Sequence, residues 1–309
     1  MIDELIRKTN DSYNISFNKY SPLTSKSYIL NCDNNKCYFT KKTELFVDEK
    51  YKFLYNQGID NILYPVINKR GNFVTEVDNK LFYVTDFYQS NAVMNETKAF
   101  HMSNQLRSVH NNTYFKRQLS VKDSRKKMED IFEYLQYKFS TLEAFVRSVE
   151  SRPFDEYSIM ILKNYQYILD GKKVMANLQR KIIADIKEKK SVNFSFIHNN
   201  PKLNHLLIAN GKEYLISIEK SKIGISSLDM AKFYIETEDV KIDMKSLIIT
   251  YFSQYEDDFY FDYFCFLVLL YYIKGIVIID KDYVSSQSII YASQSIKKFI
   301  NMFDLLQKN

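Results

Sequence analysis

The hydrophobic pattern changes its period near residue 90, and this change constrains the fold more than any other feature of the sequence. Between Tyr28 and Lys80, short runs of β-branched and aromatic residues alternate with Asn and Asp clusters, which is typical of strands joined by turns. Beyond Ser90, apolar residues recur at helical spacing over the long segments 96–110, 121–149 and 154–190. A strand-rich part therefore precedes a mainly helical part.

Each part is interrupted once by the other kind of element. In the strand-rich part, residues 44–57 have apolar side chains at helical spacing and stop before Gly58, a residue that commonly terminates helices. In the helical part, Asn210 and Gly211 form a turn signal for a hairpin. The strands expected there are 192–198, 206–208 and 214–218.

Two further helical features follow from single residues. Pro153 is expected in the first turn of the 154–190 segment, and Gly171 is expected to break that segment into two helices.

The apolar segment 259–279 contains Asp262 and Lys274, which leaves an uncharged run shorter than the roughly 20 residues that a bilayer requires. This segment is predicted to be a buried helix, and no membrane span is expected.

The composition indicates a folded protein with two joined lobes. The 309 residues are 46% hydrophobic and 26% charged, and the net charge is +6. The basic stretch 172–190 is expected to be a solvated helix face rather than a nucleic-acid site.

Cys32, Cys37 and Cys265 have neither disulfide nor zinc spacing, and the first ten residues do not resemble a signal peptide. We therefore expect synthesis in the cytoplasm.

The segment 196–233 contains the most specific motifs. It reads FIHNNPKLNHLL, then YLISIEK, then LDMAKF. This resembles the catalytic segment of aminoglycoside and choline kinases, in which HGDxHxxNxL is followed by a strand ending in IDF and by Asp-Leu-Ala at a helix start. Within that family the segment is most similar to CotS-type spore-coat proteins. The resemblance implies an α+β, bilobal protein-kinase-like fold, with an N-lobe at 1–90 and a helical C-lobe at 91–309.

Three positions depart from the family's catalytic chemistry. The resemblance places the catalytic base at Asn200, whose amide does not accept a proton near neutral pH. It places the metal-binding asparagine at His205, although magnesium prefers oxygen ligands, and the metal-binding aspartate at the uncharged Ser217. His198 is expected to stabilise the loop from the core. The resemblance thus implies a kinase-like protein with degenerate catalytic motifs.

The candidate residues for binding the nucleotide phosphates and their metal are less specific. Glu219 lies two residues beyond Ser217, and strand alternation would put both on one face, so Glu219 is the candidate for a replacement carboxylate. The family's phosphate-pairing lysine falls on Lys41 or its neighbour Lys42, with Glu49 or Glu44 as its helix partner; an exposed strand lysine is the alternative. Residues 1–57 contain no glycine, so SPLTSKSYIL at 21–30 stands in place of a glycine-rich phosphate loop.

Three functions remain open at this stage. The first is a catalytically inactive protein with a structural or scaffolding role in the spore coat or sporulation, bound to other proteins and requiring no cofactor. The second is an active small-molecule phosphotransferase that uses ATP and magnesium, with Glu219 on the metal and Lys41 on the phosphates. The third is an inactive kinase-like protein that binds nucleotide as a conformational switch.

Overall fold

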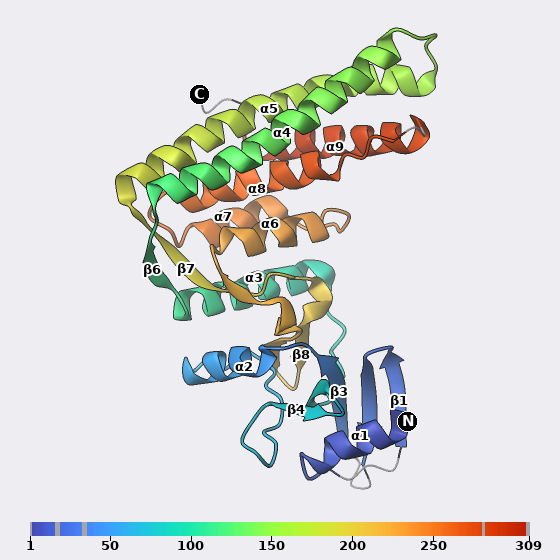
Figure 1. Cartoon of the computed structure of the whole chain (residues 1–309), viewed down its shortest axis with the longest axis vertical. Coiled ribbons are helices and arrows are strands. Elements are labelled where there is room, and N and C mark those ends of the chain that lie inside the picture. Colours follow the sequence, from blue (N-terminus) through green and yellow to red (C-terminus); the bar gives the residue numbers. More distant parts are fainter. Residues whose placement is uncertain (1, 16–18, 33–35, 280–281, 307–309) are drawn as a thin grey trace. The chain divides into compact units, whose positions relative to one another are not determined.

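The computed structural model describes residues 2–15, 19–32, 36–279 and 282–306 and groups the chain into two compact units (Figure 1). The first unit comprises Met1–Tyr114, Ser195–Ile223 and Asp239–Ile242. The second comprises Phe115–Phe194, Gly224–Glu238 and Asp243–Asn309. The first unit contains the expected N-lobe, residues 1–90, and also takes in most of the segment that resembles the kinase catalytic motif.

An antiparallel sheet of five strands, in the order β1-β2-β3-β5-β4, forms the centre of the first unit. The β4–β5 turn has Asp78 and Asn79 at φ of 49° and 57°, the left-handed conformation that Asp and Asn tolerate best. The predicted turn between β2 and β3 falls partly on residues 33–35, outside the described residues. The strands are β1 (Lys19–Thr24), β2 (Ser27–Asn31), β3 (Cys37–Thr43), β4 (Val74–Val77) and β5 (Lys80–Asp86).

Three helices accompany this sheet: α1 (Ile2–Asp11), α2 (Val47–Asn56) and α3 (Asn95–Asn112). Helix α2 buries Val47, Tyr51 and Leu54, which are spaced four and three residues apart and therefore share one face. The chain leaves α2 through Gly58 at φ 68°, so the helix predicted at 44–57 is confirmed to within three residues.

The segment that resembles a catalytic motif is hydrogen-bonded into the first unit. Its hairpin consists of β8 (Leu206–Ala209) and β9 (Lys212–Leu215), joined by the predicted Asn210–Gly211 turn. The Leu215 N–H donates to the Asn61 carbonyl at 2.8 Å, and the Leu63 N–H donates to the Leu215 carbonyl at 3.1 Å. These two bonds explain why the compact unit extends beyond residue 90. Short 3₁₀ helices flank the hairpin, η1 at Leu203–His205 and η2 at Ile218–Lys220.

The second unit is mainly helical. Strand β6 (Phe115–Gln118) pairs antiparallel with residues 191–194 of β7 (Ser191–Ile197). Strand β10 (Lys222–Gly224) begins in the first unit and ends at the first residue of the second. Figure 1 shows α4 and α5 running side by side over much of their length. The helices are α4 (Val121–Glu150), α5 (Glu156–Lys189), α6 (Ser227–Glu236), α7 (Met244–Phe252), α8 (Phe259–Gly275) and α9 (Asp282–Met302).

Helix α8 confirms the buried helix predicted at 259–279. Side chains all round it are buried, including Phe264, Phe266 and Leu269, as expected for a helix that is apolar on every face. Within the ranges that the structure describes, no helix is both long and apolar enough to cross a bilayer.

Two expectations about α5 are wrong. Pro153 lies before the helix, whose N-cap is Asp155; the Asp155 Oδ1 accepts the Ser158 N–H at 2.7 Å. No break occurs at Gly171, because α9 packs against this point: a Cβ at Gly171 would lie 3.0 Å from Ile296 Cγ2. The glycine permits close helix packing, and the helix therefore continues through it.

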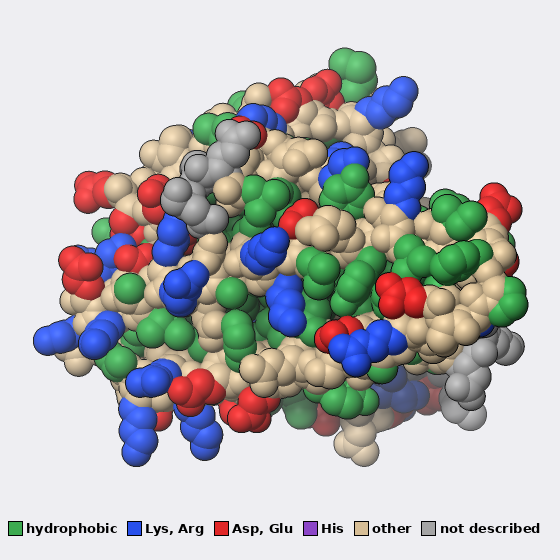
Figure 2. Space-filling model, turned by 90° about the horizontal axis from the view of Figure 1, so that it is seen from above, with side chains coloured by type: hydrophobic (Ala, Val, Ile, Leu, Met, Phe, Trp, Pro, Cys, Tyr) green, Lys and Arg blue, Asp and Glu red, His purple; other side chains and the backbone are tan. Residues whose placement is uncertain are grey.

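The basic stretch 172–190 lies on α5, and acidic groups accompany it. Lys173 lies 3.8 Å from an Asp170 oxygen, and Lys189 lies 3.0 Å from an Asp257 oxygen. The face drawn in Figure 2 likewise intersperses Lys and Arg side chains with Asp and Glu. Such mixed charge is typical of a solvated helix surface.

Replacing Gly171 by leucine tests the packing between α5 and α9. The new side chain would overlap Ile296, and overpacking of this kind costs about 1–3 kcal/mol. Urea unfolding followed by circular dichroism should show this loss. Gly275→Leu is the control, because nothing lies within 4 Å of its Cβ position. Equal losses in the two variants would contradict the close contact at Gly171.

Candidate functional site

An apolar cavity of about 180 Å³ lies within the first unit, between its sheet and the β8–β9 hairpin. Thr85, on β5, lines this cavity, is 3% exposed, and its hydroxyl has no hydrogen-bond partner among the described residues. A buried hydroxyl without a partner is unusual, and this oxygen is shielded from solvent. Asp86 and Ser217 are the other polar lining residues, and the apolar and aromatic ones are Leu23, Phe39, Tyr51, Leu63, Tyr83, Phe87, Tyr88, Leu207 and Ile216.

Lys41 and Glu219 meet next to this cavity. The Lys41 Nζ lies 2.6 Å from the Glu219 Oε1, and the Tyr83 hydroxyl donates to the same oxygen at 2.9 Å. Burial acts to raise the pKa of Glu219, but the charge and hydrogen bond of Lys41 outweigh it and hold this pKa below its usual value. Glu219 is therefore ionised at neutral pH, and its charge is matched by Lys41.

Helix α2 contributes Lys50 and Tyr51 to the same site. The Lys50 Nζ donates to the backbone carbonyl of Glu219, and burial lowers the pKa of Lys50 although Glu44 and Glu219 act in the opposite direction. The rings of Tyr51 and Tyr83 lie 5.9 Å apart in an edge-to-face arrangement. Burial raises the pKa of both tyrosines well above its usual value, so both hydroxyls stay neutral.

Asn200 and His205 are brought together in the loop after β7. The His205 Nδ1 lies 2.8 Å from the Asn200 carbonyl oxygen, and because a carbonyl accepts, this nitrogen carries the proton. Burial lowers the pKa of His205 to about 4, so the ring is neutral at physiological pH. His198 stabilises the loop as expected: it is 3% exposed, and its Nε2 lies 2.9 Å from the Ile216 carbonyl oxygen.

Ser217 and Glu219 do not share a strand face, so the prediction from strand alternation is wrong. Strand β9 ends at Leu215, and Ser217 adopts a left-handed conformation with φ 63° and ψ 47°. The next three residues form the 3₁₀ helix η2, so the period of two does not apply. Ser217 consequently lines the apolar cavity, whereas Glu219 reaches Lys41.

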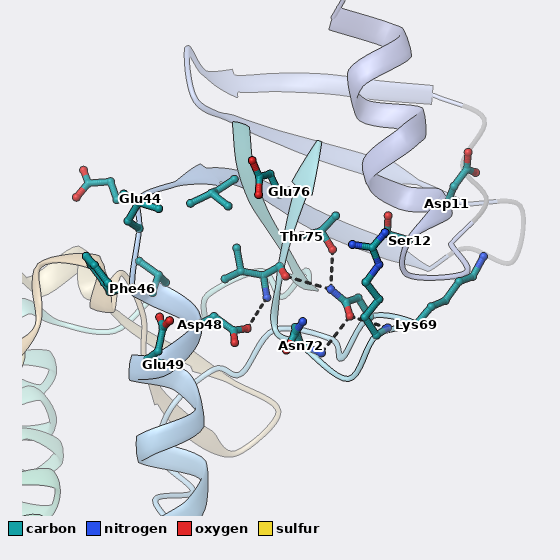
Figure 3. A pocket seen from close by; sticks show the side chains of 16 residues that line it. Asp11, Ser12, Glu44, Phe46, Asp48, Glu49, Lys69, Asn72, Thr75 and Glu76 are labelled. Carbon is teal, nitrogen blue, oxygen red and sulfur yellow. Dashed lines mark hydrogen bonds between the residues drawn. The ribbon is translucent and has the colours of Figure 1, made fainter. Parts of the chain in front are cut away.

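Glu49 lies apart from these residues. It is exposed and, with Glu44, lines a separate cavity of about 530 Å³ that includes neither Lys41 nor Glu219. Figure 3 shows Glu44 and Glu49 on one side of this cavity and Lys69 on the other. Asp48 beside them accepts the Phe73 and Val74 amides at 2.7 and 2.9 Å. The structure thus pairs Lys41 with Glu219 and gives no ion pair between Lys41 and Glu49 in the described part of the chain.

Three contributors to the site were not predicted from the sequence. Thr85 and Tyr83 sit in the strand-like run LFYVTDF, where alternation indicates a strand but does not show which side chain faces a cavity. Lys50 is one of many lysines, and its partner, the Glu219 carbonyl, lies 169 residues away in the chain. A helical wheel of α2 places Lys50 next to the buried Val47 and Leu54, three residues before and four residues after it, and this was the available signal.

The residues at the expected metal positions do not fit magnesium. Magnesium is bound in near-ideal octahedral geometry by oxygen ligands. Ser217 offers an uncharged hydroxyl, His205 a neutral imidazole, and the Glu219 carboxylate is engaged by Lys41 and Tyr83. No group of three or more His, Cys, Asp or Glu side chains able to hold a metal ion occurs within the described ranges.

Comparisons with known proteins show the fold. No protein-family model matches the sequence, and no curated protein matches it. An aminoglycoside phosphotransferase from Alicyclobacillus acidocaldarius has a similar structure, with a TM-score of 0.68, 12% identity, and coverage of 98% of this chain and 95% of that chain.

Two other solved structures are similar over nearly the whole chain. Spectinomycin phosphotransferase in complex with ADP and spectinomycin has a TM-score of 0.55, 13% identity, and coverage of 99% and 98%. Amicoumacin kinase in complex with AMP-PNP and Ca²⁺ has a TM-score of 0.54, 13% identity, and coverage of 96% and 94%. The α+β, bilobal protein-kinase-like fold expected from the sequence is thereby confirmed.

His205 should make the protein less stable in mild acid. Between pH 6.5 and 4 the unfolded chain binds a proton at this histidine and the folded protein does not, so stability falls as pH falls through this window. From pH 7.5 to pH 5 this one group accounts for a loss of about 2 kcal/mol in unfolding free energy. Urea titrations at both pH values should show a smaller loss in His205→Asn. An unchanged pH dependence would contradict the neutral, buried ring.

Proposed function

We propose that this chain is a catalytically inactive, kinase-like protein that binds a nucleotide without transferring its phosphoryl group and acts through binding to other proteins. The observation that carries the proposal is the ion pair between Lys41 and Glu219. This pair engages the Glu219 carboxylate, which an active phosphotransferase would need as a magnesium ligand. The same pair leaves an apolar cavity beside it, lined by Tyr83 and Ser217, where a nucleoside would be bound.

The base position supports the loss of transfer. Phosphoryl transfer needs a group that orients the acceptor hydroxyl and accepts its proton. Asn200 has a side-chain amide, which is not basic near neutral pH, and its backbone carbonyl accepts the His205 Nδ1–H. Neither neighbour of Asn200 is acidic, since these are Asn199 and Pro201. A small shift of the alignment therefore does not supply a base.

The cavity supports nucleotide binding. Apolar walls with a few polar groups are typical of small-molecule sites, and the polar residues that line this cavity are Thr85, Asp86 and Ser217. The two similar phosphotransferases with bound nucleotide, one with ADP and one with AMP-PNP, support carrying this ligand class over to the present chain.

Thermal-shift titration tests the proposal. ADP and ATP at millimolar concentration should raise the melting temperature equally in EDTA and in magnesium, because binding stabilises the folded state and the site has no fitting metal ligands. Thr85→Leu should reduce the shift by filling the cavity, with folding checked by circular dichroism. Release of phosphate should be absent.

Two outcomes would contradict this proposal. No stabilisation by either nucleotide would exclude nucleotide binding. Magnesium-dependent stabilisation that is lost in Glu219→Ala would favour the active phosphotransferase instead.

We propose separately that the protein acts in the spore coat. The LDMAKF segment at 228–233 resembles the helix start of CotS-type proteins and supports a structural role in the spore coat, with coat or morphogenetic proteins as partners. A fluorescent fusion in the organism that encodes the chain should gather at the surface of the developing spore. Uniform fluorescence through the cytoplasm during sporulation would contradict this role.

A further inference from the structure

We infer that Lys50 binds the phosphate groups of the nucleotide and, together with Lys41, supplies the positive charge that a divalent metal supplies in other phosphate sites. The inference rests on the nucleotide binding proposed above and assigns a phosphate-binding residue to the same site. It concerns nucleoside di- and triphosphates bound without metal.

The two lysines converge on one residue from different elements. Lys41 comes from β3 and contacts the Glu219 carboxylate, while Lys50 comes from α2 and donates to the Glu219 backbone carbonyl. Two ammonium groups therefore surround a single carboxylate at this point. The other acidic group that acts on Lys50 is Glu44, which is exposed and therefore screened by solvent. Around Glu219 positive charge is in excess, which favours an anionic ligand, and the carboxylate that lines the cavity, Asp86, is exposed to solvent and screened by it.

Lys50 also retains hydrogen-bonding capacity. An ammonium group has three N–H donors, and the contact with the Glu219 carbonyl uses one of them. Phosphate oxygens form strong, charge-assisted hydrogen bonds with such donors. Burial lowers the pKa of Lys50, and a bound anion would offset that effect by favouring the ammonium form.

The position of Lys50 matches the cavity. The next residue of α2, Tyr51, lines the cavity, and Tyr83 lines it while its hydroxyl contacts Glu219. Neither lysine lines the cavity itself; both contact Glu219, whose carboxylate accepts the hydroxyl of the cavity-lining Tyr83, so phosphates that extend past Tyr83 would meet both ammonium groups. Lys52, two residues further along α2, is held elsewhere: its Nζ lies 2.7 Å from an Asp48 oxygen and 2.6 Å from the Asn72 Oδ1.

Isothermal titration calorimetry in EDTA tests the inference, using ATP and adenosine against wild type, Lys50→Met and Lys52→Met. Loss of a charge-assisted contact should weaken ATP binding about tenfold or more in Lys50→Met and leave adenosine binding unchanged. Lys52→Met should bind both ligands as wild type does. Lys50→Arg, which keeps the charge, should retain most of the ATP affinity.

The other outcomes separate this inference from the proposed function. If Lys50→Met weakens ATP and adenosine equally, Lys50 positions α2 and the inference is overturned. If wild type binds ATP no more tightly than adenosine, the phosphate site is absent while nucleoside binding stands. If neither ligand binds to wild type, the proposed function fails and this inference fails with it.

Discussion

The ion pair between Lys41 and Glu219 connects two parts of the first unit that are distant in sequence. Lys41 belongs to the sheet, Glu219 to the 3₁₀ helix after β9, and Lys50 links the same residue to α2. Moving two charges out of water is costly, and such a pair persists when further hydrogen bonds satisfy its polar atoms. The Tyr83 hydroxyl donates such a bond to the carboxylate, and Lys50 holds the backbone of the same residue through its carbonyl. The positions of β3, α2 and η2 in this unit are therefore interdependent.

The same pair determines what chemistry the site supports. A carboxylate already matched by Lys41 and Tyr83 has little tendency to bind a cation, and the neighbouring His205 is neutral and hydrogen-bonded to backbone. Further polar groups at the site are the ammonium N–H donors of Lys50 and the cavity-lining Asp86 and Ser217.

Local signals predicted much of the fold because their causes are local. Asn and Asp tolerate left-handed conformations, so the β4–β5 and β8–β9 turns lie where the sequence indicates. The apolar spacing of α2 and the all-round apolar character of α8 depend on nearby residues alone. The break expected at Gly171 is absent for the opposite reason. The residue that makes glycine favourable there is Ile296, which is 125 positions away and enters only through packing of α9.

The sequence by itself determined which chemical groups stand where the resemblance to kinases expects catalytic residues: an amide at Asn200, an imidazole at His205 and a hydroxyl at Ser217. These identities limit the chemistry whatever the fold. The tertiary structure alone decided which groups meet. It paired Lys41 with Glu219 rather than Glu49, turned Ser217 into the cavity, and lowered the pKa of His205 by burial. Contacts between distant residues and loss of solvent arise only when the chain is folded, so no local pattern contains them.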